Sequence, residues 1–87
     1  MRNITFTAKG WSDLMEWSKN DRKIFNKISD LIEEAAKKPF KGTGKPEPLK
    51  HHLKGNWSRR ITDEHRIVYS VNDTEIKIVS CKYHYME

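Results

Sequence analysis

One carboxylate stands inside a strongly cationic stretch in the middle of the sequence. Glu47 lies between Pro46 and Pro48 in "KPEPLKHHLKGNWSRR", which also holds two histidines, three lysines and two arginines. Each proline holds its own φ at about −65° and has no N–H to donate. The pattern predicts an extended backbone that presents a carboxylate, a group able to accept a proton. The simpler alternative is an exposed glutamate in a stiff loop.

Arg60 and Arg66 have the chemistry of a phosphate site. A guanidinium can bind two oxygens at once, and it keeps its charge at any working pH. The alternative for each residue is a solvated, charged strand face.

The other basic residues of this stretch carry weaker signals. General contacts with a nucleic-acid backbone or a protein are expected for Lys50, Lys54 and Arg59. The adjacent His51 and His52 either contact bases or phosphate or simply lie at the surface. Their spacing does not suit a metal site.

The end of the chain, "CKYHYME", places His84 between Tyr83 and Tyr85. Histidine is well suited to donate a proton near neutral pH, and tyrosine can stack on a base or hydrogen-bond to a scissile group. The alternative is packing of an edge strand. Base, cation and acid together suit RNA cleavage by its own 2′-hydroxyl, which needs proton removal, phosphorane stabilisation and proton donation to the 5′-oxygen, without a metal or other cofactor.

Length and composition indicate one domain that spans residues 1–87. Cys81 is the single cysteine, so no disulfide can form within the chain, and a reducing cytoplasm is expected. The start of the chain, "MRNITFTAKGW", has no apolar run for a signal peptide or a membrane span. The net charge of +5 favours a nucleic acid or an acidic protein as partner, although a merely soluble basic surface is the alternative.

The first half of the sequence predicts a short strand and two helices. "NITF" alternates as a strand does, Thr7 can cap a first helix, and Asn20 or Asp21 can cap a second helix that ends at Pro39. Acid–base pairs four residues apart are expected along the second helix: Glu33 with Lys37, and Glu34 with Lys38. The tryptophans assigned to the core, in preference to base stacking, are Trp11, Trp17 and Trp57.

The second half predicts three strands, "NWSRRIT", "HRIVYSV" and "EIKIVSCKYHY". Turns are expected at Asp63–Glu64 and Asn72–Asp73. The predicted fold class is therefore α+β, with two N-terminal helices packed on one face of a mainly antiparallel twisted sheet in β-α-α-β-β-β order.

Apolar alternation also predicts how the first two of these strands pair. The residues expected on the buried face are Trp57 and Ile61 on one strand and Ile67, Tyr69 and Val71 on the next. Both sets share that face only if the turn has an odd number of residues, and with three Arg60 lies opposite Arg66. Two facing guanidiniums repel unless an anion lies between them, so this register predicts an anion-binding site.

The last strand is ambiguous because both of its faces are partly apolar. Ile76 and Ile78 point one way, and Val79, Cys81 and Tyr83 point the other way. Parity alone therefore leaves its orientation open.

The run "KPEPLKHHLKGNWSRRITDEHRIVYSV", followed by "CKYHY", resembles the YoeB/Txe family of toxins in the RelE-like superfamily. The resemblance extends from Trp11 through "ISDLIEEAAKKPFKGTGKPEPLKHHLKG" to Tyr85. It implies the RelE-like fold and a metal-independent, ribosome-dependent endoribonuclease that cleaves translated mRNA in the A site. Translation would thereby be inhibited.

The resemblance also implies roles for single residues. Glu47 would be the general base, Arg66 would stabilise the phosphate, His84 would be the general acid and Tyr85 would position the substrate. Further positions that the family associates with substrate contact are Lys50, His51 and Arg60.

The implied partners are the ribosome with its 16S rRNA, mRNA and a YefM/Axe-type antitoxin. Operator DNA would be bound only through the antitoxin complex, a homodimer is implied, and no membrane is involved. The alternative from another class is a non-catalytic basic module that binds RNA or antitoxin.

Overall fold

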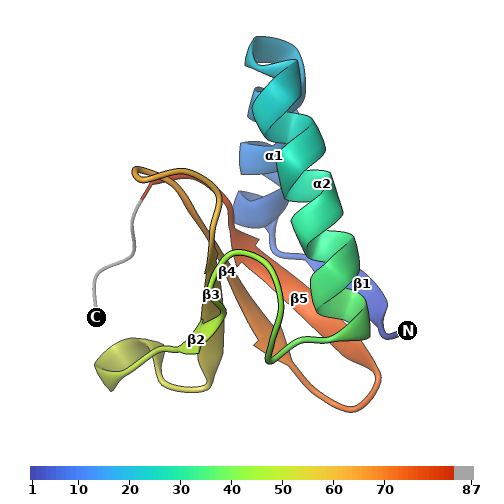
Figure 1. Ribbon diagram of the computed structural model, residues 1–87, viewed down its shortest axis with the longest axis vertical. Helices are drawn as coiled ribbons and strands as arrows, with labels where there is room; N and C mark the ends of the chain where they lie inside the picture. Colours follow the sequence, from blue (N-terminus) through green and yellow to red (C-terminus); the bar gives the residue numbers. More distant parts are fainter. Residues whose placement is uncertain (84–87) are drawn as a thin grey trace.

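The computed structural model describes residues 1–83, and within them two helices pack on a five-stranded sheet (Figure 1). The elements in chain order are β1 (Asn3–Phe6), α1 (Ala8–Asn20), α2 (Arg22–Lys37), β2 (Glu47–Pro48), a 3₁₀ turn η1 (His51–Leu53), β3 (Asn56–Arg60), β4 (Arg66–Val71) and β5 (Glu75–Ser80). The α+β class is confirmed. Within the described residues, no helix is both long and apolar enough to cross a membrane.

The strands lie in the order β1-β5-β4-β3-β2, so the first and last strands of the chain are neighbours. β1 runs parallel to β5, whereas every other pair is antiparallel. This confirms the mainly antiparallel sheet. The two-residue β2 was not predicted, because two residues are too few to show the alternation that identifies a strand.

Helix ends follow the predicted capping residues. The Thr7 side chain accepts a hydrogen bond from the Gly10 amide at 3.0 Å, and Asp21 Oδ1 accepts one from the Ile24 amide at 3.1 Å. α2 ends at Lys37, directly before the residue that Pro39 forces out of helical geometry. Each cap contributes about 1 kcal/mol to stability.

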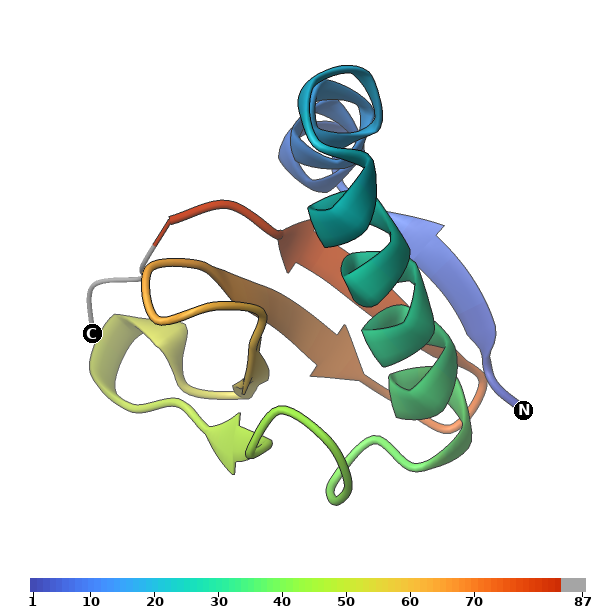
Figure 2. The same ribbon diagram turned by 45° about the horizontal axis from the view of Figure 1, so that its top comes forward.

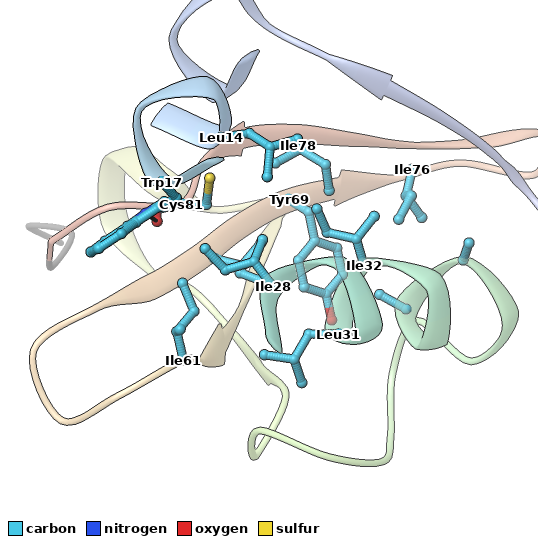
Figure 3. Packing of buried hydrophobic residues seen from close by; sticks show 13 residues of the cluster. Leu14, Trp17, Ile28, Leu31, Ile32, Ile61, Tyr69, Ile76, Ile78 and Cys81 are labelled. Carbon is cyan, nitrogen blue, oxygen red and sulfur yellow. Dashed lines mark hydrogen bonds between the residues drawn. The ribbon is translucent and has the colours of Figure 1, made fainter. Parts of the chain in front are cut away.

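The core lies between the helices and one face of the sheet (Figures 2 and 3). Its fully buried members are Ile28 and Ala36 from α2, Tyr69 from β4, Ile76 and Ile78 from β5, and Cys81. Each large apolar side chain contributes roughly 1.5–3 kcal/mol by leaving water. The polar ends in this set are satisfied: the Tyr69 hydroxyl donates to the Pro39 carbonyl at 2.6 Å, and the Cys81 thiol donates to the Gly10 carbonyl at 3.8 Å.

Only part of the tryptophan prediction is confirmed. Trp17 is buried and Trp57 packs partly buried against the core, but Trp11 is 52% exposed. On α1, Trp11 lies about 100° around the axis from the buried Gly10, so it points away from the sheet. Its ring instead meets Phe6 edge-on, at 5.6 Å between ring centroids. The core assignment of Trp11 was therefore wrong.

The predicted pairing of β3 with β4 is confirmed. Trp57 lies opposite Tyr69, and Arg60 lies opposite Arg66. The Ile61 amide donates to the His65 carbonyl at 3.0 Å and so continues the same register into the turn. The apolar alternation of both strands was sufficient to select this register.

A β-bulge explains why parity could not orient β5. Tyr69 pairs with Ile78, but its neighbour Val68 pairs with Ser80, so Val79 is an extra residue in the ladder. The bulge reverses the alternation along β5. Ile78 before it and Cys81 after it therefore both enter the core.

Arg59 is the largest correction to the sequence analysis. Its side chain is 0% exposed and lies on the helix-facing side of β3, where it cannot contact RNA in this fold. Its guanidinium donates to the Glu34 carboxylate at 2.8 Å and to the Tyr69 hydroxyl at 3.1 Å. It also donates to three backbone carbonyls, those of Lys38, Lys41 and Thr43.

Glu34 consequently does not form the expected pair with Lys38. Its carboxylate accepts from Arg59, and it also accepts from the Thr43 amide and hydroxyl at 3.0 and 3.2 Å. The other predicted pair is confirmed, with 3.8 Å between Lys37 Nζ and Glu33 Oε1. Arg59 and Glu34 thus connect β3, the end of α2 and the following loop.

Replacing Arg59 with Met should destabilise the protein by about 3–5 kcal/mol, because the half-buried Glu34 carboxylate, the Tyr69 hydroxyl and three backbone carbonyls lose their donor together. Arg60→Met is the matched control: the adjacent side chain is exposed, so its loss should cost under about 0.5 kcal/mol. Urea unfolding of both variants measures the difference. Equal stabilities would contradict the anchoring role of Arg59.

Cys81 should be inert to alkylation while the protein is folded. Burial, with a smaller contribution from the Asp13 carboxylate, raises the pKa of the Cys81 thiol to about 12. At pH 8, iodoacetamide should therefore label only urea-unfolded protein, since the thiolate is the reactive form. Fast labelling of the folded chain would contradict this packing.

The same pKa shift has a consequence for stability. Below pH 9.0, the usual pKa, folded and unfolded states both keep the proton; between that value and about 12 only the unfolded state ionises, so stability falls as pH rises. Cys81→Ala should remove this part of the alkaline loss. Unfolding curves at a series of pH values measure it.

Candidate active site

The sheet face opposite the helices carries the predicted acid and both predicted arginines. Glu47 pairs with Ser58, which pairs with Val68, so these three residues share one face. Arg60 and Arg66 lie two residues further along β3 and β4, on the same face. Strand spacings place the Cα atom of Glu47 about 8 Å from that of Arg60 and about 12 Å from that of Arg66. Long side chains can converge over such distances.

Glu47 is held by strand pairing as well as by its prolines. Pro48 lies opposite Trp57, and the next amide, that of Leu49, donates to the Asn56 carbonyl at 2.9 Å. Leu49 is buried, whereas Glu47 is exposed. The extended, presented carboxylate expected from the sequence is confirmed, and proline suits β2 because it is an edge strand.

The loop before β2 is fixed to Arg59 and to its neighbour Arg60 on β3. Arg59 binds the Thr43 carbonyl, and the neighbouring Arg60 amide donates to the Gly44 carbonyl at 2.7 Å. Gly44 has φ +88, and a Cβ at this position would lie 3.0 Å from the Arg60 carbonyl oxygen. Only glycine readily combines this conformation with so close an approach. The backbone that leads to Glu47 is therefore anchored next to Arg60.

Arg66 is half-buried and folded against the turn that precedes it. Its Nη1 donates to three carbonyls, at 2.6 Å to Thr62, 3.1 Å to Asp63 and 3.0 Å to His65. Within residues 1–83, none of the hydrogen bonds described for this guanidinium uses Nη2 or Nε. Those donors suit a phosphate, as does the exposed Arg60 on the neighbouring strand.

The other exposed basic residues that the sequence analysis singled out lie in or beside η1, which follows β2 in the chain. Lys50, His51 and Lys54 are all exposed there, and His52 is exposed beside them. The Lys54 amide closes η1 by donating to the His51 carbonyl at 3.0 Å. These residues, together with Arg60 and Arg66 on the sheet face, are called the basic surface below.

His84 and Tyr85 lie outside the described residues, but the chain leading to them is well placed. The Tyr83 carbonyl accepts from the backbone amide of Arg66 at 3.1 Å. The described chain therefore ends beside the arginine that was predicted to stabilise phosphate. Within residues 1–83, no group of three or more His, Cys, Asp or Glu side chains could hold a metal ion.

The sequence analysis assigned no role to His65. The structure buries it to 7% exposure, and its Nδ1 accepts a hydrogen bond from the Tyr83 amide at 2.8 Å. Its partner is a backbone group 18 residues away, so no local motif signals the contact. A histidine directly before the candidate phosphate residue Arg66 was the only available hint.

Comparison with known proteins shows the family to which this chain belongs. The family model described as YoeB-like toxin of bacterial type II toxin-antitoxin system matches residues 6–85. Toxin YoeB of Streptomyces coelicolor is 54% identical over 82 residues, which cover 94% of this chain and 98% of that protein.

Two solved structures from Staphylococcus aureus are also similar. A YoeB dimer has a TM-score of 0.89 at 47% identity and covers 97% of this chain and 98% of its own. A heterotetrameric YoeB-YefM toxin-antitoxin complex has a TM-score of 0.88 at 46% identity, with 98% and 99% covered. The fold, the extent of the matches and their identity agree, and the chain belongs to the YoeB-like toxins of bacterial type II toxin–antitoxin systems.

Proposed function

We propose that this toxin is a ribosome-dependent endoribonuclease that cleaves translated mRNA in the A site without a metal ion and so inhibits translation. The observation that supports it best is the strand register that gathers Glu47, Arg60 and Arg66 on one sheet face. The backbone contact between Tyr83 and Arg66 brings the chain that continues into His84 to the same place. In this proposal the base and the cations come from the sheet face, and the acid comes from the segment that follows Tyr83.

The proposed reaction is a transesterification. The Glu47 carboxylate takes the proton of the 2′-hydroxyl, whose oxygen attacks the adjacent phosphorus. Arg66, with Arg60 beside it, stabilises the negative charge of the phosphorane. His84 gives a proton to the departing 5′-oxygen while Tyr85 positions the substrate. The products are a 2′,3′-cyclic phosphate and a 5′-hydroxyl, and no water is consumed.

The basic surface would bind the ribosome. A chain of net charge +5 gains affinity for RNA by releasing the counterions of phosphates. Lys50, His51 and Lys54 lie exposed beside Glu47 and would contact 16S rRNA or the mRNA backbone. Arg59 has no part in this contact, because its side chain is buried.

The proposed partners follow from the relatives. The similar structures from Staphylococcus aureus are a dimer and a complex with YefM. We infer a YefM/Axe-type antitoxin with acidic groups that cover Arg60 and Arg66, a homodimeric toxin, and operator DNA bound only through the antitoxin complex. The protein would act in the cytoplasm, where mRNA is translated.

Glu47→Gln and His84→Ala should each lower single-turnover cleavage of ribosome-bound mRNA by about 100-fold or more, the usual contribution of a general base or acid. Each change removes proton transfer and keeps the basic surface, so ribosome binding should persist. Glu33→Gln, an exposed acid on α2, is the matched control and should cleave normally.

Two further readouts separate the nuclease from a non-catalytic binding module. Wild-type protein should leave cyclic phosphate and 5′-hydroxyl ends and should arrest growth unless antitoxin is supplied. Unaltered cleavage by both the Glu47 and His84 variants would refute the assigned acid–base pair. Normal growth without antitoxin, with no cut mRNA, would favour the module.

Arg60→Gln should weaken ribosome binding and reduce its dependence on salt. Removing one cation that neutralises a phosphate changes the slope of log K against log [salt] by about 0.7 for single-stranded RNA. Lys19→Gln removes an equal charge from the end of α1 and should leave the slope nearly unchanged. Binding to mRNA-programmed ribosomes across a KCl series, in the Glu47→Gln background, measures both. Identical slopes for the two variants would contradict the anion site.

A further inference from the structure

Two side chains of α1 hold the segment that follows β5. Asp13 Oδ2 accepts from the Cys81 amide at 3.1 Å, and Trp17 Nε1 donates to the Cys81 carbonyl at 2.8 Å. Both polar groups of the chain around this residue are thereby satisfied in the interior. The next side chain, Lys82, forms a salt bridge with Glu16. Helix α1 thus fixes the chain as far as residue 82.

Beyond that point the backbone takes an unusual conformation. Tyr83 has φ +62, in the left-handed region that bulky residues rarely adopt. Its side chain is 56% exposed, so side-chain burial does not explain the conformation. Backbone contacts hold it instead: its amide donates to His65 Nδ1 at 2.8 Å, and its carbonyl accepts from the Arg66 amide at 3.1 Å. A strained residue held by its neighbours is characteristic of functional sites.

His65 is itself firmly placed. Its ring meets Trp17 edge-on at 4.8 Å between centroids and lies 5.3 Å from the Tyr83 ring. Because Nδ1 accepts a hydrogen bond, the imidazole is neutral and carries its hydrogen on Nε2, which lies 3.5 Å from a Glu64 carboxylate oxygen. Its own carbonyl accepts from Nη1 of Arg66. His65 therefore contacts Trp17 of α1, Arg66 and Tyr83.

We propose that His65 is a positioning residue for the C-terminal acid: its Nδ1 holds Tyr83 in the left-handed conformation and so sets the direction in which the chain continues to His84. This inference rests on the proposed function. A general acid must lie within hydrogen-bond reach of the atom that it protonates. An error of about 1 Å in such a group can cost about 100-fold in rate.

Three substitutions separate the hydrogen bond from the packing of the ring. His65→Asn places an oxygen acceptor where Nδ1 lies but loses most of the ring. His65→Phe keeps a ring against Trp17 but has no acceptor. His65→Gln is polar, yet its amide corresponds to Nε2 rather than Nδ1, so it also fails to accept from Tyr83. The three variants thus differ in acceptor position independently of ring packing.

Single-turnover cleavage on saturating ribosomes should follow the acceptor. We expect a loss of about 100-fold for His65→Phe and His65→Gln, with ribosome affinity nearly unchanged, and retention within about tenfold for His65→Asn. Hydrogen exchange of the Tyr83 amide should be slow in wild type and His65→Asn and fast in the other two. Urea unfolding of each variant shows whether activity merely follows stability.

Each result has a distinct meaning. Wild-type cleavage rates in His65→Phe or His65→Gln, with fast Tyr83 exchange, would overturn the positioning role. Activity that follows stability across all three variants, with His65→Asn as inactive as the others, would overturn it too. If wild type cleaves no ribosome-bound mRNA, the proposed function fails instead, whereas the Tyr83 exchange pattern still tests the hydrogen bond.

Discussion

The alternation of two adjacent arginines on β3 is the constraint on which the rest of the molecule depends. Arg59 points into the interior, where its guanidinium binds Glu34, the Tyr69 hydroxyl and three loop carbonyls. Arg60 points to the opposite face, opposite Arg66. A slip of one residue in the pairing of β3 would exchange the two roles. It would bury the candidate phosphate ligand and expose the group that fixes the loop before Glu47.

Much of the fold was predictable because its determinants are local. The caps at Thr7 and Asp21 and the pairing of β3 with β4 depend on residues close in sequence or on simple alternation. The same alternation puts Arg59 on the buried face, between Trp57 and Ile61. Its partners were not predictable, because backbone carbonyls satisfy most of its donors and a carbonyl leaves no signature in the side-chain pattern. The bulge at Val79 likewise defeats any argument from parity.

The residues of the candidate site also differ in how far the sequence could predict them. Chemically distinctive residues such as Glu47 and Arg66 were proposed from their type and surroundings, and strand register places them on one face. His65 was missed because its main contacts, with the Tyr83 amide and the Trp17 ring, join residues that are distant in the sequence. Residue chemistry can thus suggest which groups react, whereas the groups that position them depend on tertiary contacts that only the folded chain contains.

In the proposed mechanism the two halves of the site are anchored independently. The base is held by β2 and the Arg59-bound loop, while the segment leading to the acid is held by Asp13 and Trp17 of α1 and by His65. Arg66 joins them, since its amide binds Tyr83 and its guanidinium folds onto the turn beside Arg60. Donors fixed before the substrate arrives need no reorganisation when charge develops on the phosphorane. By the proposed mechanism, a basic surface that binds RNA broadly would still deliver acid and base to a single phosphodiester.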